Sequence, residues 1–171
     1  ETLDQVKEAI IKGELSFPFV WKSAEMGYDG YGVSIVHSNK EIESLNTGPC
    51  LIEELVTFEK ELSVIVCRRP QGETVHYPVV ESEFHPRANQ VEYVLCPARI
   101  SEQAAKKAVE VALKTAEAFG QIGLLAVELF LTPEGDILVN EVAPRPHNSG
   151  HFSIEASYTC QFEQHIRAVL D

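Results

Sequence analysis

Glu128 and Glu141 are spaced so that they face each other across a predicted β-hairpin. Each lies inside an apolar run, and the sequence Pro-Glu-Gly-Asp at 133–136 between the runs is a hairpin turn signal. With Glu134-Gly135 as a two-residue loop, Glu128 lies directly opposite Glu141. Partners of this kind have Cβ atoms roughly 4.5–5.5 Å apart. The spacing therefore predicts two adjacent carboxylates.

Two carboxylates side by side on an apolar hairpin need a cation or a shared proton. Oxygen ligands with Asn140 beside them suit Mg²⁺, which usually binds through one or two carboxylates plus substrate phosphates. The alternative is an ordinary hairpin whose acidic face is solvated. The same register puts Phe130 and Val139 on that face, and their apolar side chains argue against full solvation.

The segment that follows the hairpin is dense in side chains that bind anions. Its sequence at 143–151, Ala-Pro-Arg-Pro-His-Asn-Ser-Gly-His, includes Arg145, His147 and Asn148. For His151 and His165 the predicted role is structural, because most such histidines satisfy packing or helix ends.

A second candidate site lies near the N-terminus, where Lys22 ends an apolar strand pattern and a glycine-rich segment, 27–33, follows. Backbone N–H groups of such a loop can wrap an anion. A glycine-rich loop between two strands, with a lysine on the first strand, can cover the phosphates of a nucleotide. A plain hairpin loop with a solvated lysine remains the open alternative.

The composition excludes several classes of protein. A net charge of −12 argues against nucleic acid as a partner. No apolar run approaches the ~18 residues of a transmembrane helix and no signal peptide opens the chain, so no membrane partner is expected. The four cysteines have no zinc-site spacing, which favours reduced thiols in a cytoplasmic protein. Because the chain starts at Glu1 and its only Met is Met26, we expect a fragment of a longer protein.

The hydrophobic periodicity predicts an α+β fold. The clearest helix is 101–120, with Ser101 as N-cap and Gly120 as its stop. Its apolar stripe consists of Ala105, Ala108, Val109, Ala112, Ala116 and Phe119. The other expected helices are 3–12 (capped by Thr2 and Gln5), 39–46 and 161–170. The expected strands are 17–22, 33–36, 50–56, 61–67, 75–80, 94–95 and the hairpin 123–142.

This order of parts resembles the ATP-grasp family: a lysine on a strand, a glycine-rich flap, a Glu-Glu-Leu-Val connector at 53–56, Glu61 opening a strand, and the two-glutamate hairpin. The run at 140–151 and the sequence Gln-Phe-Glu-Gln-His at 161–165 resemble the branch of the family that acts in purine biosynthesis. That branch carboxylates 5-aminoimidazole ribonucleotide with bicarbonate and ATP. The resemblance implies a small lid subdomain and a larger body of antiparallel sheet with packed helices.

The resemblance also implies the residues that would bind ATP. Lys22 would hold the α- and β-phosphates, and His85 would lie near the nucleotide. The flap that covers the phosphates would consist of Gly27, Tyr28, Asp29, Gly30, Tyr31, Gly32 and Val33. Backbone groups that read the adenine edge would come from Glu53, Glu54, Leu55 and Val56. Glu61 would hold the ribose hydroxyls, and Asn140 and Glu141 would contact the nucleotide.

The same resemblance implies the groups that carry the chemistry. Glu128 and Glu141 would hold Mg²⁺. Arg145 would be catalytic, binding bicarbonate and the transferred phosphoryl group, and His147 and Asn148 would line the acceptor pocket. ATP and Mg²⁺ are the expected cofactors.

Members of this branch carry an N-terminal domain and a C-terminal segment that help to bind the ribonucleotide. We expect the 171 residues to be the ATP-grasp region without them, with a lid at 1–51, a body at 52–171 and little turnover of its own. A homodimer is possible for the full-length protein. Two alternatives stay open: another ATP-grasp ligase, such as the formate-dependent glycinamide ribonucleotide transformylase, and a nucleotide-binding module without turnover. Ala143 and the sequence Asn-Ser-Gly-His at 148–151 argue against the first.

Overall fold

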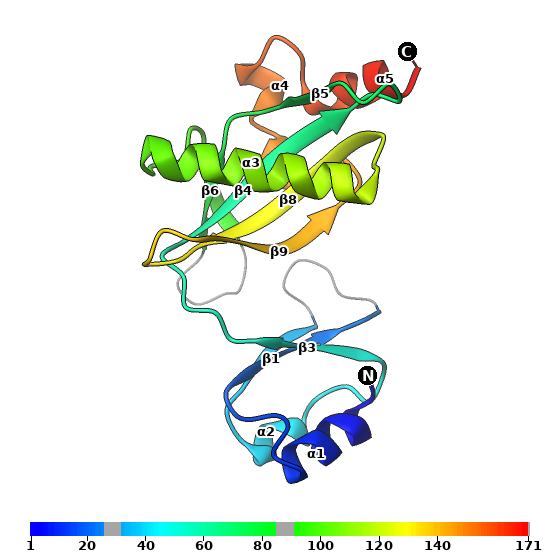
Figure 1. The fold of residues 1–171 in the computed structure, drawn as a ribbon, viewed down its shortest axis with the longest axis vertical. Coiled ribbons are helices and arrows are strands. Elements are labelled where there is room, and N and C mark those ends of the chain that lie inside the picture. Colours follow the sequence, from blue (N-terminus) through cyan, green and yellow to red (C-terminus); the bar gives the residue numbers. More distant parts are fainter. Residues whose placement is uncertain (26–31, 85–90, 171) are drawn as a thin grey trace. The chain divides into compact units, whose positions relative to one another are not determined.

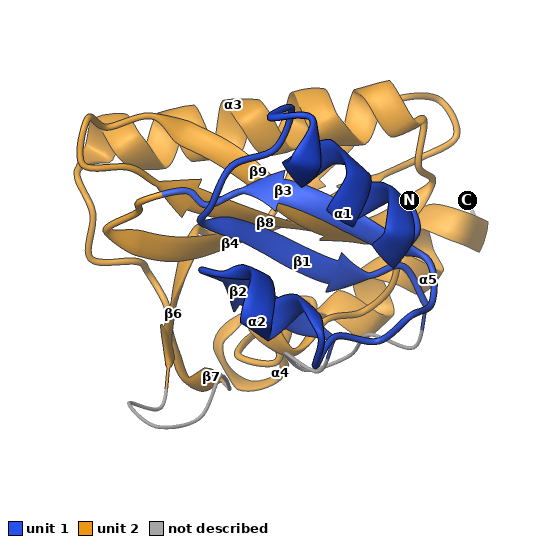
Figure 2. Cartoon of the chain, turned by 90° about the horizontal axis from the view of Figure 1, so that it is seen from below, with its two compact units in different colours: residues 1–56 blue, residues 57–171 orange. Residues whose placement is uncertain are grey.

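The computed structural model describes residues 1–25, 32–84 and 91–170, and these form two compact units (Figure 2). Unit 1 comprises Glu1–Val56 and unit 2 comprises Thr57–Asp171. The observed division follows the third strand, Cys50–Glu54, whereas the expected division at 51 would have cut that strand. The fold is of the expected α+β class.

Unit 1 is a three-stranded antiparallel sheet with two helices (Figure 1). Its elements are α1 (Leu3–Ile11), β1 (Phe19–Ser23), β2 (Val33–Val36), α2 (Asn39–Ile42) and β3 (Cys50–Glu54). The strand order is β2-β1-β3. The predicted capping box of α1 is present, because Thr2 and Gln5 each bind the backbone of the other. The expected helix at 39–46 is wrong in length, since α2 ends at Ile42.

The core of unit 1 lies on one face of this sheet. Leu3 and Val6 of α1 and Ile42 of α2 pack there against Phe19 and Trp21 of β1. Strand side chains alternate between faces, so Val20 and Lys22 lie on the opposite face. That opposite face also carries Val33, Ile35 and Leu51, whose side chains are exposed.

Unit 2 contains a six-stranded antiparallel sheet with helices on both faces (Figures 1 and 2). The sheet order is β7-β6-β4-β8-β9, and β5 pairs with β4 off this path. The strands are β4 (Lys60–Arg68), β5 (Thr74–His76), β6 (Val80–Phe84), β7 (Val91–Leu95), β8 (Gly123–Leu131) and β9 (Ile137–Ala143). The helices are α3 (Glu102–Phe119), the 3₁₀ turn η1 (Asn148–Gly150), α4 (Ser153–Ala156) and α5 (Gln161–Leu170).

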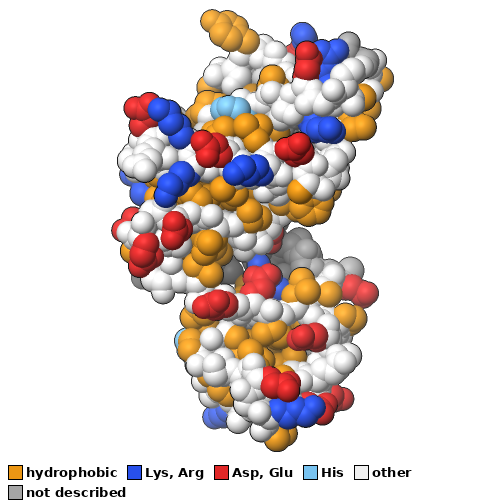
Figure 3. All heavy atoms as spheres, in the orientation of Figure 1, with side chains coloured by type: hydrophobic (Ala, Val, Ile, Leu, Met, Phe, Trp, Pro, Cys, Tyr) orange, Lys and Arg blue, Asp and Glu red, His pale blue; other side chains and the backbone are white. Residues whose placement is uncertain are grey.

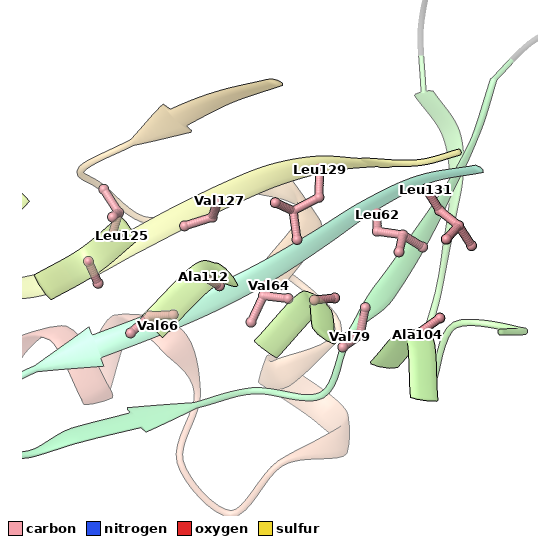
Figure 4. Packing of buried hydrophobic residues seen from close by; sticks show 12 residues of the cluster. Leu62, Val64, Val66, Val79, Ala104, Ala112, Leu125, Val127, Leu129 and Leu131 are labelled. Atoms are coloured by element: carbon pink, nitrogen blue, oxygen red, sulfur yellow. The ribbon is translucent and has the colours of Figure 1, made fainter. Parts of the chain in front are cut away.

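Helix α3 covers one face of the large sheet. Every fourth residue of the helix from Ala104 to Ala116 is a buried alanine, and these small side chains let the helix approach the strands closely. Figure 4 shows the opposing layer of Val64, Val127 and Leu129 from β4 and β8. The predicted caps Ser101 and Gly120 are both present. Phe119 was wrongly placed in the apolar stripe, since it is 66% exposed at the end of the helix.

The other face of the sheet packs on α5. Ile65, Leu124 and Ala126 form a buried cluster there with Ala168 of the helix. His165 of the same helix accepts a hydrogen bond at Nδ1 from the Leu124 N–H, at 3.1 Å. Its predicted structural role is therefore confirmed, and the large sheet is supported on both faces.

Strand β6 carries a buried carboxylate, Glu81. Lys60 and Arg99 both form ion pairs with it, and the Arg99 backbone N–H also donates to it. The Arg99 guanidinium is the main cause that lowers the pKa of Glu81 to about 2, with Lys60 adding to the effect against the cost of burial. Arg99 also pairs with Glu83.

Two further sequence-based expectations concern β5 and the loop before α5. The expected single strand at 75–80 is wrong, because β5 ends at His76 and β6 begins at Val80. Tyr77, Pro78 and Val79 lie between them. Tyr77 keeps a backbone hydrogen bond to Ile65 of β4, and its hydroxyl donates to the Thr159 carbonyl at 2.7 Å. The loop after the hairpin contains η1 and α4, which were not predicted.

Figure 3 shows acidic and basic side chains interspersed over the exposed side of α3, in keeping with its Glu102–Lys106 ion pair. All four cysteines are free thiols, as predicted. Burial raises the pKa of Cys67 to about 11. In the part of the chain that the structure describes, no helix is long and apolar enough to span a membrane.

Candidate active site

The β8–β9 hairpin brings Glu128 and Glu141 together. The two residues are direct partners across the antiparallel ladder, so this predicted pairing is confirmed. The expected two-residue turn is wrong. Thr132 and Asp136 close a three-residue loop through the Thr132 N–H and the Asp136 carbonyl, at 2.9 Å, and Gly135 takes the left-handed position with φ of 82°.

A β-bulge restores the predicted pairing. Leu129 pairs with Val139, whereas Glu128 pairs with Glu141, so Asn140 is the extra residue. A bulge makes two residues oppose one on the partner strand. Asn140 and Glu141 therefore both lie opposite Glu128. The expectation that Val139 shares their face is wrong, because the shortened register pairs Leu138 with Phe130 instead.

The carboxylate of Glu128 has a partner that the sequence did not reveal. His147 Nε2 lies 3.0 Å from Glu128 Oε1. Ser149 Oγ lies 2.9 Å from His147 Nδ1, and the buried Ser63 Oγ lies 2.9 Å from Ser149 Oγ. Because a carboxylate only accepts, Nε2 donates to Glu128, and in the neutral ring Nδ1 accepts from Ser149. These contacts form one chain that fixes the orientation of Glu128.

The strand β4 contributes to the same face of the sheet. Ser63 is the direct cross-strand partner of Glu128, and Glu61 is that of Phe130. Phe130 stacks on Phe58 with ring centroids 4.4 Å apart and an interplanar angle of 10°. Glu61, Ser63, Phe130 and Glu128 thus line one surface, opposite the face covered by α3.

The remaining predicted residues of unit 2 lie on the loop after β9. Arg145 is exposed, and its guanidinium donates to the Pro146 carbonyl at 3.1 Å. Asn148 is also exposed and accepts from the Ser149 N–H at 2.9 Å. The structure gives neither of them a contact with Glu128. His85 lies outside the described residues.

In unit 1 the predicted Lys22 forms an ion pair with Glu53, with Nζ 2.8 Å from Oε2. Lys22 pairs with Leu51 and Glu53 pairs with Val20, so the two charged residues are diagonal neighbours on adjacent strands. This contact was not predicted, because only the backbone of Glu53 had been assigned a role. Glu54 ends β3, and Leu55 and Val56 follow it.

Only the end of the predicted flap falls within the described residues. Gly32 has a left-handed φ of 85°, and Val33 begins β2. Its other members, Gly27, Tyr28, Asp29, Gly30 and Tyr31, lie outside them.

The donor set at Glu128 and Glu141 fits a hard cation only in part. Among residues 1–25, 32–84 and 91–170, no group of three or more His, Cys, Asp or Glu side chains could hold a metal ion. Two carboxylates with a nearby amide are what Mg²⁺ uses when substrate phosphates supply further oxygen ligands. The arrangement therefore suits a metal that arrives with a nucleotide, rather than a resident structural ion.

Sequence reasoning missed three residues that support this site: Ser63, Ser149 and Gln161. Ser63 had one signal, a lone hydroxyl between Leu62 and Val64 in an apolar strand. The one signal for Gln161 was its place in the family-like sequence at 161–165, because a glutamine at the start of an amphipathic helix is usually solvated. It is nevertheless fully buried.

A family model described as the ATP-grasp domain matches residues 1–162. The chain belongs to the ATP-grasp family. It is 42% identical to N5-carboxyaminoimidazole ribonucleotide synthase of Bacillus subtilis (strain 168), over 99% of this chain and 44% of that protein. It is also 40% identical to phosphoribosylaminoimidazole carboxylase of Candida glabrata, over 99% of this chain and 30% of that protein.

Solved structures of ATP-grasp relatives agree. The ADP complex of an N5-carboxyaminoimidazole ribonucleotide synthetase matches with a TM-score of 0.88 and 43% identity, over 98% of this chain and 45% of that one. The Aspergillus clavatus N5-carboxyaminoimidazole synthase in complex with ADP and 5-aminoimidazole ribonucleotide matches with a TM-score of 0.84 and 34% identity, over 97% and 43%. This ATP-grasp chain thus spans less than half the length of these relatives.

Proposed function

We propose that this chain is the nucleotide-binding part of an ATP-dependent carbon–nitrogen ligase of de novo purine biosynthesis. The ligase would carboxylate 5-aminoimidazole ribonucleotide with bicarbonate and ATP, giving 5-(carboxyamino)imidazole ribonucleotide, ADP and phosphate. The observation that carries the proposal is the opposed pair Glu128 and Glu141, in a chain that is 42% identical to a named synthase of this reaction.

Glu128 and Glu141 would hold Mg²⁺, and Asn140 would lie beside the bound nucleotide. When bound, the metal would neutralise charge on the phosphate oxygens. His147 supports this role, since it holds Glu128 in one orientation before any nucleotide binds. Both ring nitrogens of His147 already have hydrogen-bond partners, Glu128 and Ser149. We therefore propose that His147 influences the acceptor pocket indirectly, by holding the carboxylate of Glu128.

Each unit carries further groups that would bind parts of the nucleotide. In unit 2, Phe130 and the stacked Phe58 offer an aromatic surface beside Glu61, whose carboxylate can accept from ribose hydroxyls. In unit 1, Lys22 would bind the α- and β-phosphates, and the backbone at 53–56 would read the adenine edge. Unit 1 would serve as the lid, with the 27–33 segment as the flap.

The acceptor chemistry would use the loop after β9. Arg145 carries a planar fork of donors that matches the oxygens of bicarbonate and of the transferred phosphoryl group. Asn148 would contribute a polar group to the same pocket. Attack of bicarbonate on the γ-phosphate would give carboxyphosphate, which hydrolyses readily, so the closed site has to exclude water. The amine of the ribonucleotide would then take up the carboxyl group.

The chain spans less than half the length of its relatives, and this difference gives a direct test of the proposed function. The nucleotide contacts lie within the 171 residues, so Mg-ATP should raise the melting temperature of the chain. A ligand that binds the native state alone stabilises it by about 2.7 kcal/mol at a hundredfold excess over its Kd. The ribonucleotide alone should give no shift, and phosphate release stimulated by bicarbonate and ribonucleotide should need the length of the relatives.

A higher melting temperature with the ribonucleotide but not with Mg-ATP would overturn the proposal.

We further propose a cytoplasmic location, as the purine pathway implies, and a homodimer for a protein of the relatives' length.

A further inference from the structure

Gln161, the first residue of α5, grips the backbone of His147. Its side-chain Oε1 accepts from the His147 N–H at 2.9 Å, and its Nε2 donates to the His147 carbonyl at 2.7 Å. A primary amide presents a donor and an acceptor side by side, so it can satisfy both backbone groups of one residue. Because Gln161 is fully buried, water does not compete for these bonds.

The position of Gln161 is itself fixed. Its backbone N–H donates to Ser153 Oγ at 2.9 Å, and that hydroxyl donates to the Gly150 carbonyl at 2.6 Å. Gly150 packs so closely that a Cβ there would lie 2.2 Å from Ile65 Cδ1 and 2.7 Å from Gln161 Oε1. The loop, α4 and the start of α5 are therefore tied together around the amide.

These two hydrogen bonds to the backbone of His147 also affect the position of its imidazole. Gln161 holds the backbone of His147, and the imidazole Nε2 lies 3.0 Å from Glu128 Oε1. Ser149 Oγ contacts the other ring nitrogen, Nδ1. The fold provides no such clamp for Arg145 or Asn148, which lie on the exposed part of the same loop. The clamped residue is thus the one that touches the candidate metal carboxylate.

We propose that Gln161 is a positioning residue of the metal–nucleotide site. It fixes the backbone of His147, which keeps the imidazole on Glu128 and orients this carboxylate for Mg²⁺. The inference rests on the proposed function for the identity of the ion, but the placement of the imidazole by Gln161 is independent of it. Partners that orient metal ligands typically change metal affinity by about 10–100-fold when removed.

The test compares Gln161→Met with Gln164→Met in the 171-residue chain. Methionine keeps the length of glutamine and removes both hydrogen bonds. Gln164 lies one turn later in α5, and its side chain has no hydrogen bond to any described residue. Gln161→Glu serves as a second variant, which keeps one acceptor and replaces the donor with a second acceptor facing the His147 carbonyl.

Two measurements separate positioning from a structural role. The first is the ¹⁵N NMR spectrum of the His147 ring, assigned by its loss in His147→Gln. The native chain should show the signals of one fixed ring environment, and Gln161→Met should show averaged signals. The second is the Mg²⁺ dependence of ATP binding by calorimetry, which should weaken about tenfold in Gln161→Met and stay within twofold of the native chain in Gln164→Met.

An unchanged ring spectrum and an unchanged Mg²⁺ dependence in Gln161→Met would overturn the inference. A lower melting temperature with both of these unchanged would also overturn it, because Gln161 would then be structural only. A native chain that binds no Mg-ATP would instead overturn the proposed function, and the ring spectrum would still show whether Gln161 places His147.

Discussion

The two units hold their candidate ligand-binding side chains in different ways. In unit 1, Lys22 forms an ion pair with Glu53, whose side chain is 39% exposed, on a sheet face with other exposed side chains. In unit 2, Glu128 is held by His147, which is held in turn by Ser149 and by the buried Gln161. The two side chains are similarly exposed, Lys22 at 14% and Glu128 at 18%, but Lys22 pairs with the more exposed Glu53, whereas Glu128 ends a chain of contacts that reaches buried residues.

The difference follows from how each sheet is covered. The core of unit 1 packs α1 and α2 on one face of three strands, and Lys22 lies on the other face. The sheet of unit 2 has α3 on one face and α5 on the other, and the network that holds Glu128 ends on two buried residues, Ser63 and Gln161. We therefore expect the carboxylate of Glu128 to be more preorganised than the ammonium of Lys22.

The largest expected change in ligand affinity comes from Glu141→Gln. Removing one of two opposed carboxylates should lower Mg-ATP affinity by about a hundredfold, or about 2.8 kcal/mol at 1.4 kcal/mol per tenfold, while the fold stays intact. Isothermal calorimetry measures the affinity, and circular dichroism checks the fold. Glu134→Gln, an exposed residue in the turn of the same hairpin, is the matched control. If the native chain and Glu141→Gln bound Mg-ATP with equal affinity, the assignment of the metal to this hairpin would be wrong.

The sequence was sufficient for part of this site. Alternation along each strand and the turn signal placed Glu128 opposite Glu141, because side-chain direction in a strand follows from residue number alone. The bulge at Asn140 was not predicted, because no residue type marks a bulge and its extra residue cancelled the error in turn length. A correct pairing was thus reached through a wrong register near the turn.

Long-range contacts could not be predicted from the sequence. The Lys22–Glu53 pair depends on β3 lying next to β1, and alternation does not say which strands become neighbours. Gln161 resembles a solvated residue at the start of a helix, since its partner is the backbone of His147 in an irregular loop. Caps, by contrast, were predictable, because Ser101 and Gly120 act on residues within one turn.

The second prediction concerns acid. Glu81 in unit 2 has a folded-state pKa of about 2, below the ordinary value of 4.5, mainly because of Arg99. A depressed pKa stabilises the fold above 4.5, and this contribution is lost as the pH falls from 4.5 towards 2. It amounts to about 3 kcal/mol at 1.36 kcal/mol per pKa unit. Glu81→Gln should flatten this pH dependence.

Hydrogen exchange in β4 and β8 reports the acid effect in unit 2. The only tryptophan, Trp21, is buried in unit 1, so its fluorescence reports that unit separately. We expect the exchange rates in unit 2 to respond to pH between 4.5 and 2 more than the Trp21 transition does. A Trp21 transition that moves as far with pH as the unit 2 exchange rates would contradict the assignment of the effect to Glu81.

The third prediction compares Lys22 of unit 1 directly with Glu141 of unit 2. Lys22→Met should weaken ATP binding by roughly tenfold, or about 1.4 kcal/mol, because a lysine ammonium binds phosphate as a single point charge. The effect should be the same with and without Mg²⁺, whereas that of Glu141→Gln should appear only with Mg²⁺. Lys12→Met, on the exposed side of unit 1, is the control. If the loss of ATP affinity in Lys22→Met appeared only with Mg²⁺, Lys22 and Glu141 would act on the same group of the ligand.

The smallest expected effect is on the stability of unit 1. The Lys22–Glu53 pair is short, at 2.8 Å, but Glu53 is 39% exposed, so solvent screens the attraction. Exposed ion pairs contribute about 0–1 kcal/mol, since ordering two long side chains offsets most of the Coulomb energy. A double-mutant cycle of Lys22→Met and Glu53→Gln, followed by Trp21 fluorescence in urea, should therefore give a coupling below about 1 kcal/mol. A coupling of about 3 kcal/mol, the size that breaking a buried pair produces, would show that Lys22 is fixed as firmly as Glu128. In that case Lys22 and Glu128 would be equally preorganised, and the contrast between the two units would fail.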